Sequence, residues 1–221
     1  MSSFPYDETY AEIVRVAQSI SVVRTEGDGR IDSAMKEQPF LQELRRQLLS
    51  SHPTWEIQIS PPRAACDVLI NGIRVNLKLT DCKTADNAAN KPSIFYSITG
   101  LTTYPYSSNW NDFLAKLTEA RARGEFKRTR DKTTEYHYLA KNKLTGEVLF
   151  KPIFDIHTYV SNASNDLQIN WRHEFEHAGH TTDDDKYMEK VVALLRAIQK
   201  SVQEMIARTR LFADADFSTL L

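Results

Sequence analysis

Apolar residues recur three and four positions apart in several stretches of the chain, a spacing that places them on one face of a helix. The most regular stripe lies between Met35 and Ser50 and contains four leucines. Three other stretches have the same spacing. The predicted helices are Tyr6–Ser21, Met35–Ser50, Trp110–Arg121 and a long amphipathic helix over Asp184–Leu211.

Shorter stretches alternate apolar and polar residues, or are rich in β-branched and aromatic residues, and are bounded by turn residues. The predicted strands are Trp55–Ile59, a hairpin over Cys66–Thr80, Ser93–Leu101, Tyr136–Ala140, Val148–Tyr159 and Leu167–Trp171. From Met35 onward the order is helix, strand, two-stranded hairpin, helix, strand. This order predicts an α/β (α+β) fold, in which helices flank a mixed central β-sheet.

The hairpin has the sharpest local signal, because Asn71-Gly72 lies midway through the segment CDVLINGIRVNLK. Asn and Gly tolerate the positive φ angles of a two-residue turn, which fixes the register of both strands. One face then contains only apolar side chains: Cys66, Val68, Ile70, Ile73, Val75 and Leu77. On the other face Asp67 lies opposite Asn76, with Lys78 one pleat further along. Opposed Cβ atoms are about 5 Å apart, so two oxygens could share a small cation.

Composition limits the alternatives. A chain of 221 residues with 41% apolar content fits one domain, and it lacks an apolar run long enough for a membrane span. The N-terminal segment MSSFPYDETY lacks the basic-then-apolar pattern of a signal peptide. We therefore expect a cytoplasmic protein, with Cys66 and Cys82 as reduced thiols. The net charge of −1 means that a nucleic-acid surface must be a local patch. Basic residues concentrate between Lys116 and Lys132, a pattern that more often belongs to a solvated helix end and turn than to a nucleic-acid surface.

The hairpin and the elements around it resemble the PD-(D/E)xK nucleases, and among these the type II restriction endonucleases. That family has an α-β-β-β-α-β core, with an Asp opening the second strand and an acidic-x-Lys triplet on the third. Asp67 and Asn76-Leu77-Lys78 occupy these places, and the matching elements cover roughly residues 35–141. The chain departs from the pattern in having Cys66 before the Asp and Asn76 at the acidic position. The resemblance implies one restriction-endonuclease-like domain over residues 1–221, with residues 142–221 supplying DNA-recognition strands, loops and the last helix.

The resemblance also implies roles for individual residues. Asp67, the Asn76 amide oxygen and the Leu77 backbone carbonyl would bind Mg²⁺, and Lys78 would orient and stabilise the attacking water. Because a neutral Asn attracts Mg²⁺ more weakly than a carboxylate, another acidic residue is expected nearby. Glu43 on the leading helix is preferred to Glu56 on the first strand. The expected activity is site-specific hydrolysis of double-stranded DNA by a homodimer, with a cognate DNA methyltransferase as genetic partner.

Side chains that can hydrogen-bond to base edges or phosphates cluster in three segments. One is the loop after the catalytic strand, the second follows Trp110–Arg121, and the third is the Asn-rich stretch before the last helix, where Asn and Ser are equally suited to form a simple turn. The candidate DNA-binding residues are Lys83, Asn87, Asn90, Lys91, Arg128, Arg130, Asn162, Asn165, Gln168, Arg172 and His173.

Two other functions stay open. His173-Glu174-x-x-His177 matches the HExxH motif of zinc metalloproteases, with His180 or Glu189 as a third ligand, although Gly179 follows too closely for a stable helix. The scaffold could also bind DNA or a partner protein without catalysis. The stripe on the last helix suits either a dimer interface or packing against the core.

Overall fold

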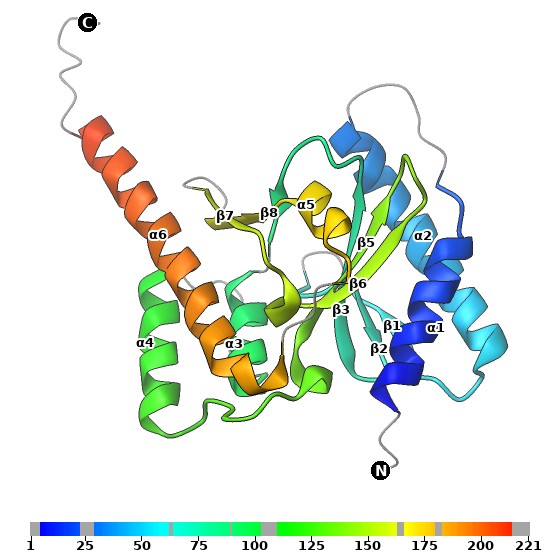
Figure 1. Ribbon diagram of the computed structural model, residues 1–221, viewed down its shortest axis with the longest axis horizontal. Coiled ribbons are helices and arrows are strands. Elements are labelled where there is room, and N and C mark those ends of the chain that lie inside the picture. Colours follow the sequence, from blue (N-terminus) through cyan, green and yellow to red (C-terminus); the bar gives the residue numbers. More distant parts are fainter. Residues whose placement is uncertain are drawn as a thin grey trace, which may run out of the picture.

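The computed structural model describes residues 5–22, 29–61, 64–88, 90–102, 110–162, 166–179 and 183–213. It is a mixed α/β structure with two sheets (Figure 1), which confirms the predicted fold class. Within the described residues, none of the helices has the length and apolar character needed to span a membrane.

The larger sheet has five strands in the order β1-β2-β3-β5-β6. Its strands are β1 (Ile57–Ile59), β2 (Val68–Ile70), β3 (Ile73–Thr80), β5 (Tyr136–Asn142) and β6 (Val148–Pro152). β3 and β5 are parallel, whereas every other neighbouring pair is antiparallel. The polar strand positions Asn76 and Lys78 lie beside Tyr138 and Ala140 of β5, at the centre of the sheet.

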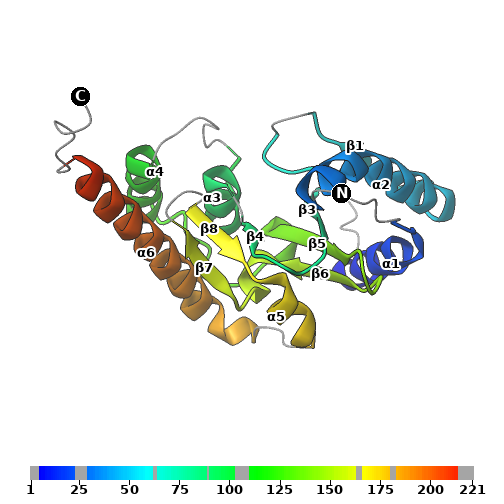
Figure 2. The same cartoon turned by 90° about the horizontal axis from the view of Figure 1, so that it is seen from above.

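Helices cover both faces of this sheet (Figure 2). One face packs against α1 (Tyr6–Ser19) and α2 (Gly29–Ser51), through a core that includes Val68, Val75 and Leu77. The other face packs into a second core shared with α3 (Lys91–Thr99), α4 (Trp110–Ala122) and α6 (Tyr187–Ala213).

A smaller antiparallel sheet, in the order β4-β8-β7, packs into the same core as α3, α4 and α6. It consists of β4 (Asp86–Asn87), β7 (Tyr159–Asn162) and β8 (Asp166–Ile169). Residues 81–85 connect it directly to the carboxyl end of β3, and α5 (Trp171–Glu176) follows β8. Among the described residues, three short 3₁₀ turns lie between the larger elements: η1 (Lys132–Thr134), η2 (Ile153–Asp155) and η3 (Asp184–Lys186).

One predicted strand is wrong, and a second is confirmed only over its first five residues. Ser93–Leu101 lies largely in helix α3, which Asn90 caps at its N-terminus and Gly100 ends with a φ of 76°. Because residues 92–99 are buried all round, the segment lacks the amphipathic spacing that would have identified a helix. The predicted strand Val148–Tyr159 is interrupted, since β6 ends at Pro152, which has no N–H to continue the ladder, and η2 follows.

Candidate metal and nuclease site

The predicted hairpin turn is confirmed. Asn71 and Gly72 have φ angles of 50° and 84°, and β2 pairs with β3 in the predicted register, with Ile70 opposite Ile73 and Val68 opposite Val75. On the N-terminal side of Val68 the predicted backbone pairing, with Asp67 directly opposite Asn76, is wrong. The Asp67 N–H donates to the Val75 carbonyl at 2.9 Å, so Asp67 and Val68 both oppose one residue, as in a β-bulge.

This bulge changes the environment of two side chains. Cys66 was expected on the apolar face with Val68, but it packs into the core on the opposite face of the sheet and is 7% exposed. Asp67 still meets Asn76, as predicted. The bulge ends the regular ladder before Leu77, whose N–H is then available to a side chain.

Two donors hold the carboxylate of Asp67. Its Oδ2 accepts a hydrogen bond from the Leu77 N–H at 2.7 Å and one from the Asn76 amide nitrogen at 2.8 Å. Both bonds end on the same oxygen. They fix the orientation of the carboxylate and leave Oδ1 as the oxygen that could bind a cation.

Asn76 supplies the second oxygen. Its Nδ2 donates to Asp67, so its Oδ1 is fixed as the acceptor end of the amide, and this atom is buried without a hydrogen-bond partner in the described structure. A buried acceptor without a partner is costly and calls for an explanation. A hard cation that prefers oxygen ligands, such as Mg²⁺, fits this atom.

The Leu77 backbone points toward the same place. In a strand, the N–H and C=O of one residue point to the same side, and the Leu77 N–H points to Asp67. The Leu77 carbonyl oxygen is therefore directed to the Asp67 side of β3, as the third predicted metal ligand requires. The ligand set so far comprises a carboxylate, an amide oxygen and a peptide oxygen.

Charged groups around these ligands act on one another. Burial raises the pKa of Asp67, against the opposing effects of the Leu77 N–H and the Lys78 ammonium. Burial likewise raises the pKa of Glu37 on α2, where Lys78 opposes the shift and the charges of Asp67 and Asp86 add to it. Lys78 is thus within electrostatic range of both Asp67 and Glu37.

Glu37 is an acidic residue near Lys78 and Asp67 that the sequence analysis did not single out. It precedes Glu43 on α2 by six residues, which at 100° per residue places the two glutamates on different sides of the helix. Hydrogen bonds from Arg46 and Gln47 engage Glu43 and hold its pKa at about 2. The structure therefore favours Glu37 over Glu43 as the additional carboxylate, a choice that the helix stripe alone could not make.

The alternative carboxylate, Glu56, lies at the other end of β2. Its carbonyl accepts the Asn71 N–H at 2.8 Å and its own N–H donates to the Asn71 side chain, beside the hairpin turn. The whole length of β2 separates it from Asp67. Among the described residues there is no cluster of three His, Cys, Asp or Glu side chains arranged to hold a metal ion. The candidate site therefore depends on its amide and peptide oxygens.

Two of the expected DNA-binding residues have structural roles, and for them the prediction is corrected. The Asn90 side chain accepts from Ser93 as the cap of α3, and its Nδ2 donates to the Ala65 carbonyl at 3.2 Å. The side chain of Arg130 is 1% exposed and forms ion pairs with Glu135, Asp155 and Asp184. Neither can reach DNA without breaking these bonds.

The other candidates fall into three groups. Lys83, Arg128 and Arg172 are exposed, and Lys91 is the first residue of α3. Asn87, Gln168 and Asn162 lie together on the smaller sheet. Asn165 is outside the described residues. His173 stacks on His177 with ring centroids 4.1 Å apart.

The HExxH motif begins in α5 and ends at His177, the residue that caps this helix, and its glutamate is a structural residue. Glu174 is fully buried, its Oε2 pairs with Lys151 at 3.0 Å, and its Oε1 accepts from the N–H groups of His157 and Thr158 and from the Thr158 hydroxyl. Burial raises its pKa, but the Thr158 hydroxyl and Lys151 more than offset this, so the pKa lies below its usual value. With both oxygens occupied, Glu174 cannot activate water, which argues against the metalloprotease. His180, one expected ligand, lies outside the described residues.

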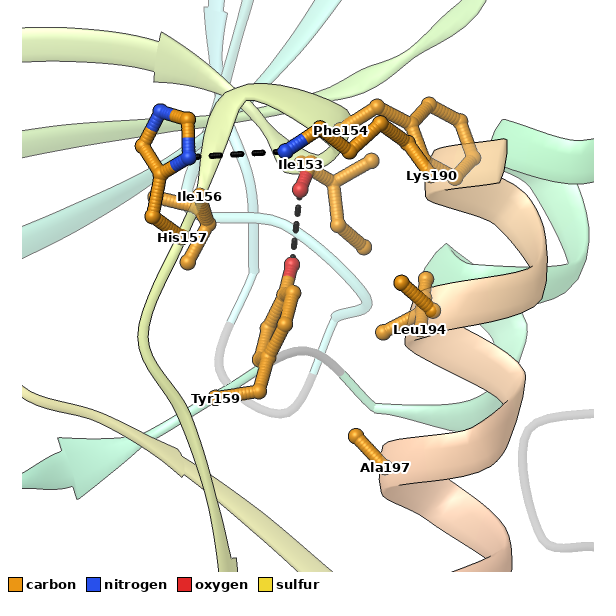
Figure 3. A pocket seen from close by; sticks show the side chains of 9 residues that line it. Ile153, Phe154, Ile156, His157, Tyr159, Lys190, Leu194 and Ala197 are labelled. Atoms are coloured by element: carbon orange, nitrogen blue, oxygen red, sulfur yellow. Dashed lines mark hydrogen bonds between the residues drawn. The ribbon is translucent and has the colours of Figure 1, made fainter. Parts of the chain in front are cut away.

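A pocket of about 180 Å³ lies between η2, the start of β7 and α6 (Figure 3). Its walls are mainly apolar, with Lys190 Nζ 3.4 Å from His157 Nδ1 on one side and the Tyr159 hydroxyl bonded to the Ile153 carbonyl. It is lined by Ile153, Phe154, Ile156, His157, Tyr159, Lys190, Ala193, Leu194 and Ala197. None of these belongs to the hairpin site, and no carboxylate is among the described residues that line the pocket.

Comparison with protein families, curated proteins and solved structures finds no match to this chain.

Proposed function

We propose that this protein is a Mg²⁺-dependent type II restriction endonuclease, which hydrolyses phosphodiester bonds in double-stranded DNA at a specific short sequence. The observation that carries the proposal is the buried, unpaired oxygen of Asn76 beside a carboxylate held by two donors. A side chain in this state is explained by a cation that it binds during function.

The order of the elements supports a restriction-endonuclease-like core. α2, β1, β2, β3, α4 and β5 follow one another as the resemblance requires, with α3 and the short β4 inserted before α4. The strand that carries Asn76 and Lys78, β3, pairs with β2 on one side and with the parallel strand β5 on the other. It therefore lies inside the sheet, and both neighbours fix its position.

Each residue of the site has a chemical role in the proposal. Mg²⁺, when bound, supplies charge neutralisation at the scissile phosphate and increases the acidity of a water molecule. Asp67, Asn76 and the Leu77 carbonyl hold it, and Glu37 adds negative charge that compensates for the neutral Asn76. Lys78, on the same face of β3 as Asn76, orients the attacking water and stabilises its deprotonated form.

The proposal extends to the protein's surroundings. An enzyme that cuts both strands of a palindromic site acts as a homodimer, because a twofold axis relates the two scissile bonds. A cognate DNA methyltransferase protects the host's own sites. The enzyme and the methyltransferase would share the cytoplasm with the DNA on which they act.

The proposal is tested by incubating supercoiled plasmid DNA with the protein in Mg²⁺ and in EDTA. We expect discrete fragments in Mg²⁺ alone, and a rate at least about 100-fold lower for Lys78→Met. Lys200→Met makes the same change on the exposed surface of α6 and serves as the matched control, with thermal unfolding of each variant as the test of folding. Absence of cleavage by the wild type, or cleavage that persists in EDTA, contradicts the proposal. Binding of DNA without cleavage supports the non-catalytic alternative.

A further inference from the structure

The smaller sheet has one buried and one outward face. Leu167 and Ile169 of β8 are 2% and 0% exposed, and they pack into the core beneath the sheet. Because side chains alternate along a strand, Gln168 between them points to the outward face. Asn87 of β4 lies directly opposite Gln168, and Asn162 of β7 belongs to the same outward face.

Hydrogen bonds connect these three amides across the sheet. Asn162 Nδ2 donates to Gln168 Oε1 at 3.0 Å, and Gln168 Nε2 donates to Asn87 Oδ1 at 3.5 Å, the long end of the hydrogen-bonding range. Rotating the Gln168 amide by half a turn would bring two oxygens together at Asn87 and two nitrogens together at Asn162. These two hydrogen bonds therefore fix which end of the Gln168 amide donates and which end accepts. Within the described part of the chain, one N–H and one oxygen lone pair of this amide remain for another partner.

We infer that the outward face of this sheet reads adenine in the major groove of the DNA, with Gln168 as the central base-reading residue and Asn87 beside it. Asn and Gln amides pair bidentately with adenine, accepting from N6 and donating to N7. Three strands about 4.8 Å apart span about 10 Å, which fits a major groove about 12 Å wide. The inference rests on the proposed nuclease function of the neighbouring hairpin site.

Continuity and charge favour DNA as the occupant. The catalytic strand β3 leads through residues 81–85 into β4, and Asp86, next to Asn87, acts electrostatically on Glu37. Two exposed cations, Lys83 on this connection and Arg172 after β8, suit the DNA phosphates on either side of a base reader. The Arg172 charge acts electrostatically on Cys82, the neighbour of Lys83 in the chain. Both cations therefore lie near the connection between β3 and the smaller sheet.

The experiment uses a library of DNA duplexes with a randomised central segment. The full-length protein selects bound duplexes in Ca²⁺, which takes oxygen ligands, and cleaves the library in Mg²⁺ in a parallel reaction. Both sets of sequences are read for the wild type, Gln168→Ala, Gln168→Glu and Gln203→Ala. Gln203 is an exposed glutamine on α6 and is the matched control. Thermal unfolding shows whether each variant folds.

We expect the wild type and Gln203→Ala to share a consensus that contains an A·T pair. Gln168→Ala loses the preference at that pair and binds the consensus about 10- to 100-fold more weakly. Gln168→Glu, whose carboxylate can only accept, disfavours adenine there and gains preference for cytosine. A consensus without A·T pairs, or an unchanged consensus for Gln168→Ala, overturns the inference. If sequence-selective binding is seen without cleavage, the proposed nuclease function fails alone; if no duplex is selected or cut, both fail.

Discussion

At the scale of single residues, Asp67 combines burial with a negative charge. Because burial raises its pKa, ionisation of Asp67 costs stability, and this cost grows as the pH rises through the pKa of the folded state. We therefore expect Asp67→Asn to be more stable than the wild type in EDTA, by about 2–4 °C in Tm at pH 7, with the gap closing toward pH 4. Added Mg²⁺ should raise the Tm of the wild type and leave the variant unchanged.

Thermal unfolding between pH 4 and pH 8, in EDTA and in Mg²⁺, measures this prediction. Asp81→Asn, at a partly exposed aspartate after β3, is the control for a change of charge alone. A wild type that is the more stable of the two at pH 7 in EDTA would show that Asp67 does not bear the cost assigned to it.

The two glutamates of α2 allow a matched comparison. Glu37 acts electrostatically on Lys78 and Asp67, whereas Glu43 is engaged by Arg46 and Gln47. Glu37→Gln should weaken Mg²⁺ binding about tenfold and lower the cleavage rate, because it removes a negative charge near the cation. Glu43→Gln should leave both unchanged. Calorimetric titration with Mg²⁺ checks the binding part, and the reverse ranking of the two variants would restore Glu43 to the site.

At the scale of elements, the hairpin shows how far local sequence reaches. Asn71-Gly72 specifies the turn, and the turn fixes the pairing of Val68 with Val75, so the proximity of Asp67, Asn76 and Lys78 was predictable. The bulge at Asp67 was not predictable. It depends on the Ser60 N–H, which donates to the Asp67 carbonyl, and on the packing of Cys66 into the opposite core.

Helix α5 contains the glutamate of a sequence motif, HExxH, that suggests catalysis. In the structure this glutamate has a stabilising role. Glu174 and Lys151 form a buried pair with side chains 0% and 5% exposed, which joins α5 to β6. Glu174→Gln leaves the Lys151 ammonium buried without its counter-charge, so we expect it to destabilise the protein by about 3–5 kcal/mol. Urea unfolding measures this loss. A variant of normal stability that had lost a zinc-dependent cleavage of casein would revive the metalloprotease.

At the scale of the whole molecule, the fold class and the elements α2, β1, β2, β3, α4 and β5 follow from local sequence patterns, whereas α3 and the contacts between distant segments do not. Helix α3 escaped prediction because both its sides are buried. Glu37 escaped because its place near Lys78 depends on how α2 packs on the sheet. The sequence predicts Arg130 to be a surface cation, but its side chain is buried and forms ion pairs with three acidic residues. Two of these, Asp155 and Asp184, are distant along the chain.

The proposed homodimer is a prediction about the whole molecule. Sedimentation in the presence of DNA should give a protein mass twice the 25.3 kDa of one chain, and plasmid cleavage should produce linear DNA with little nicked intermediate. A monomer that releases nicked circles first would mean that each chain cuts one strand independently.

The most direct test of the central claim is a crystal structure with Mn²⁺, which accepts the same oxygen ligands as Mg²⁺ and gives an anomalous signal. We expect one peak within about 2.3 Å of Asp67 Oδ1, Asn76 Oδ1 and the Leu77 carbonyl oxygen, and no peak there in Asp67→Asn. A peak elsewhere, or an Asn76 amide oxygen that accepts a hydrogen bond from the protein in place of binding metal, would contradict the account.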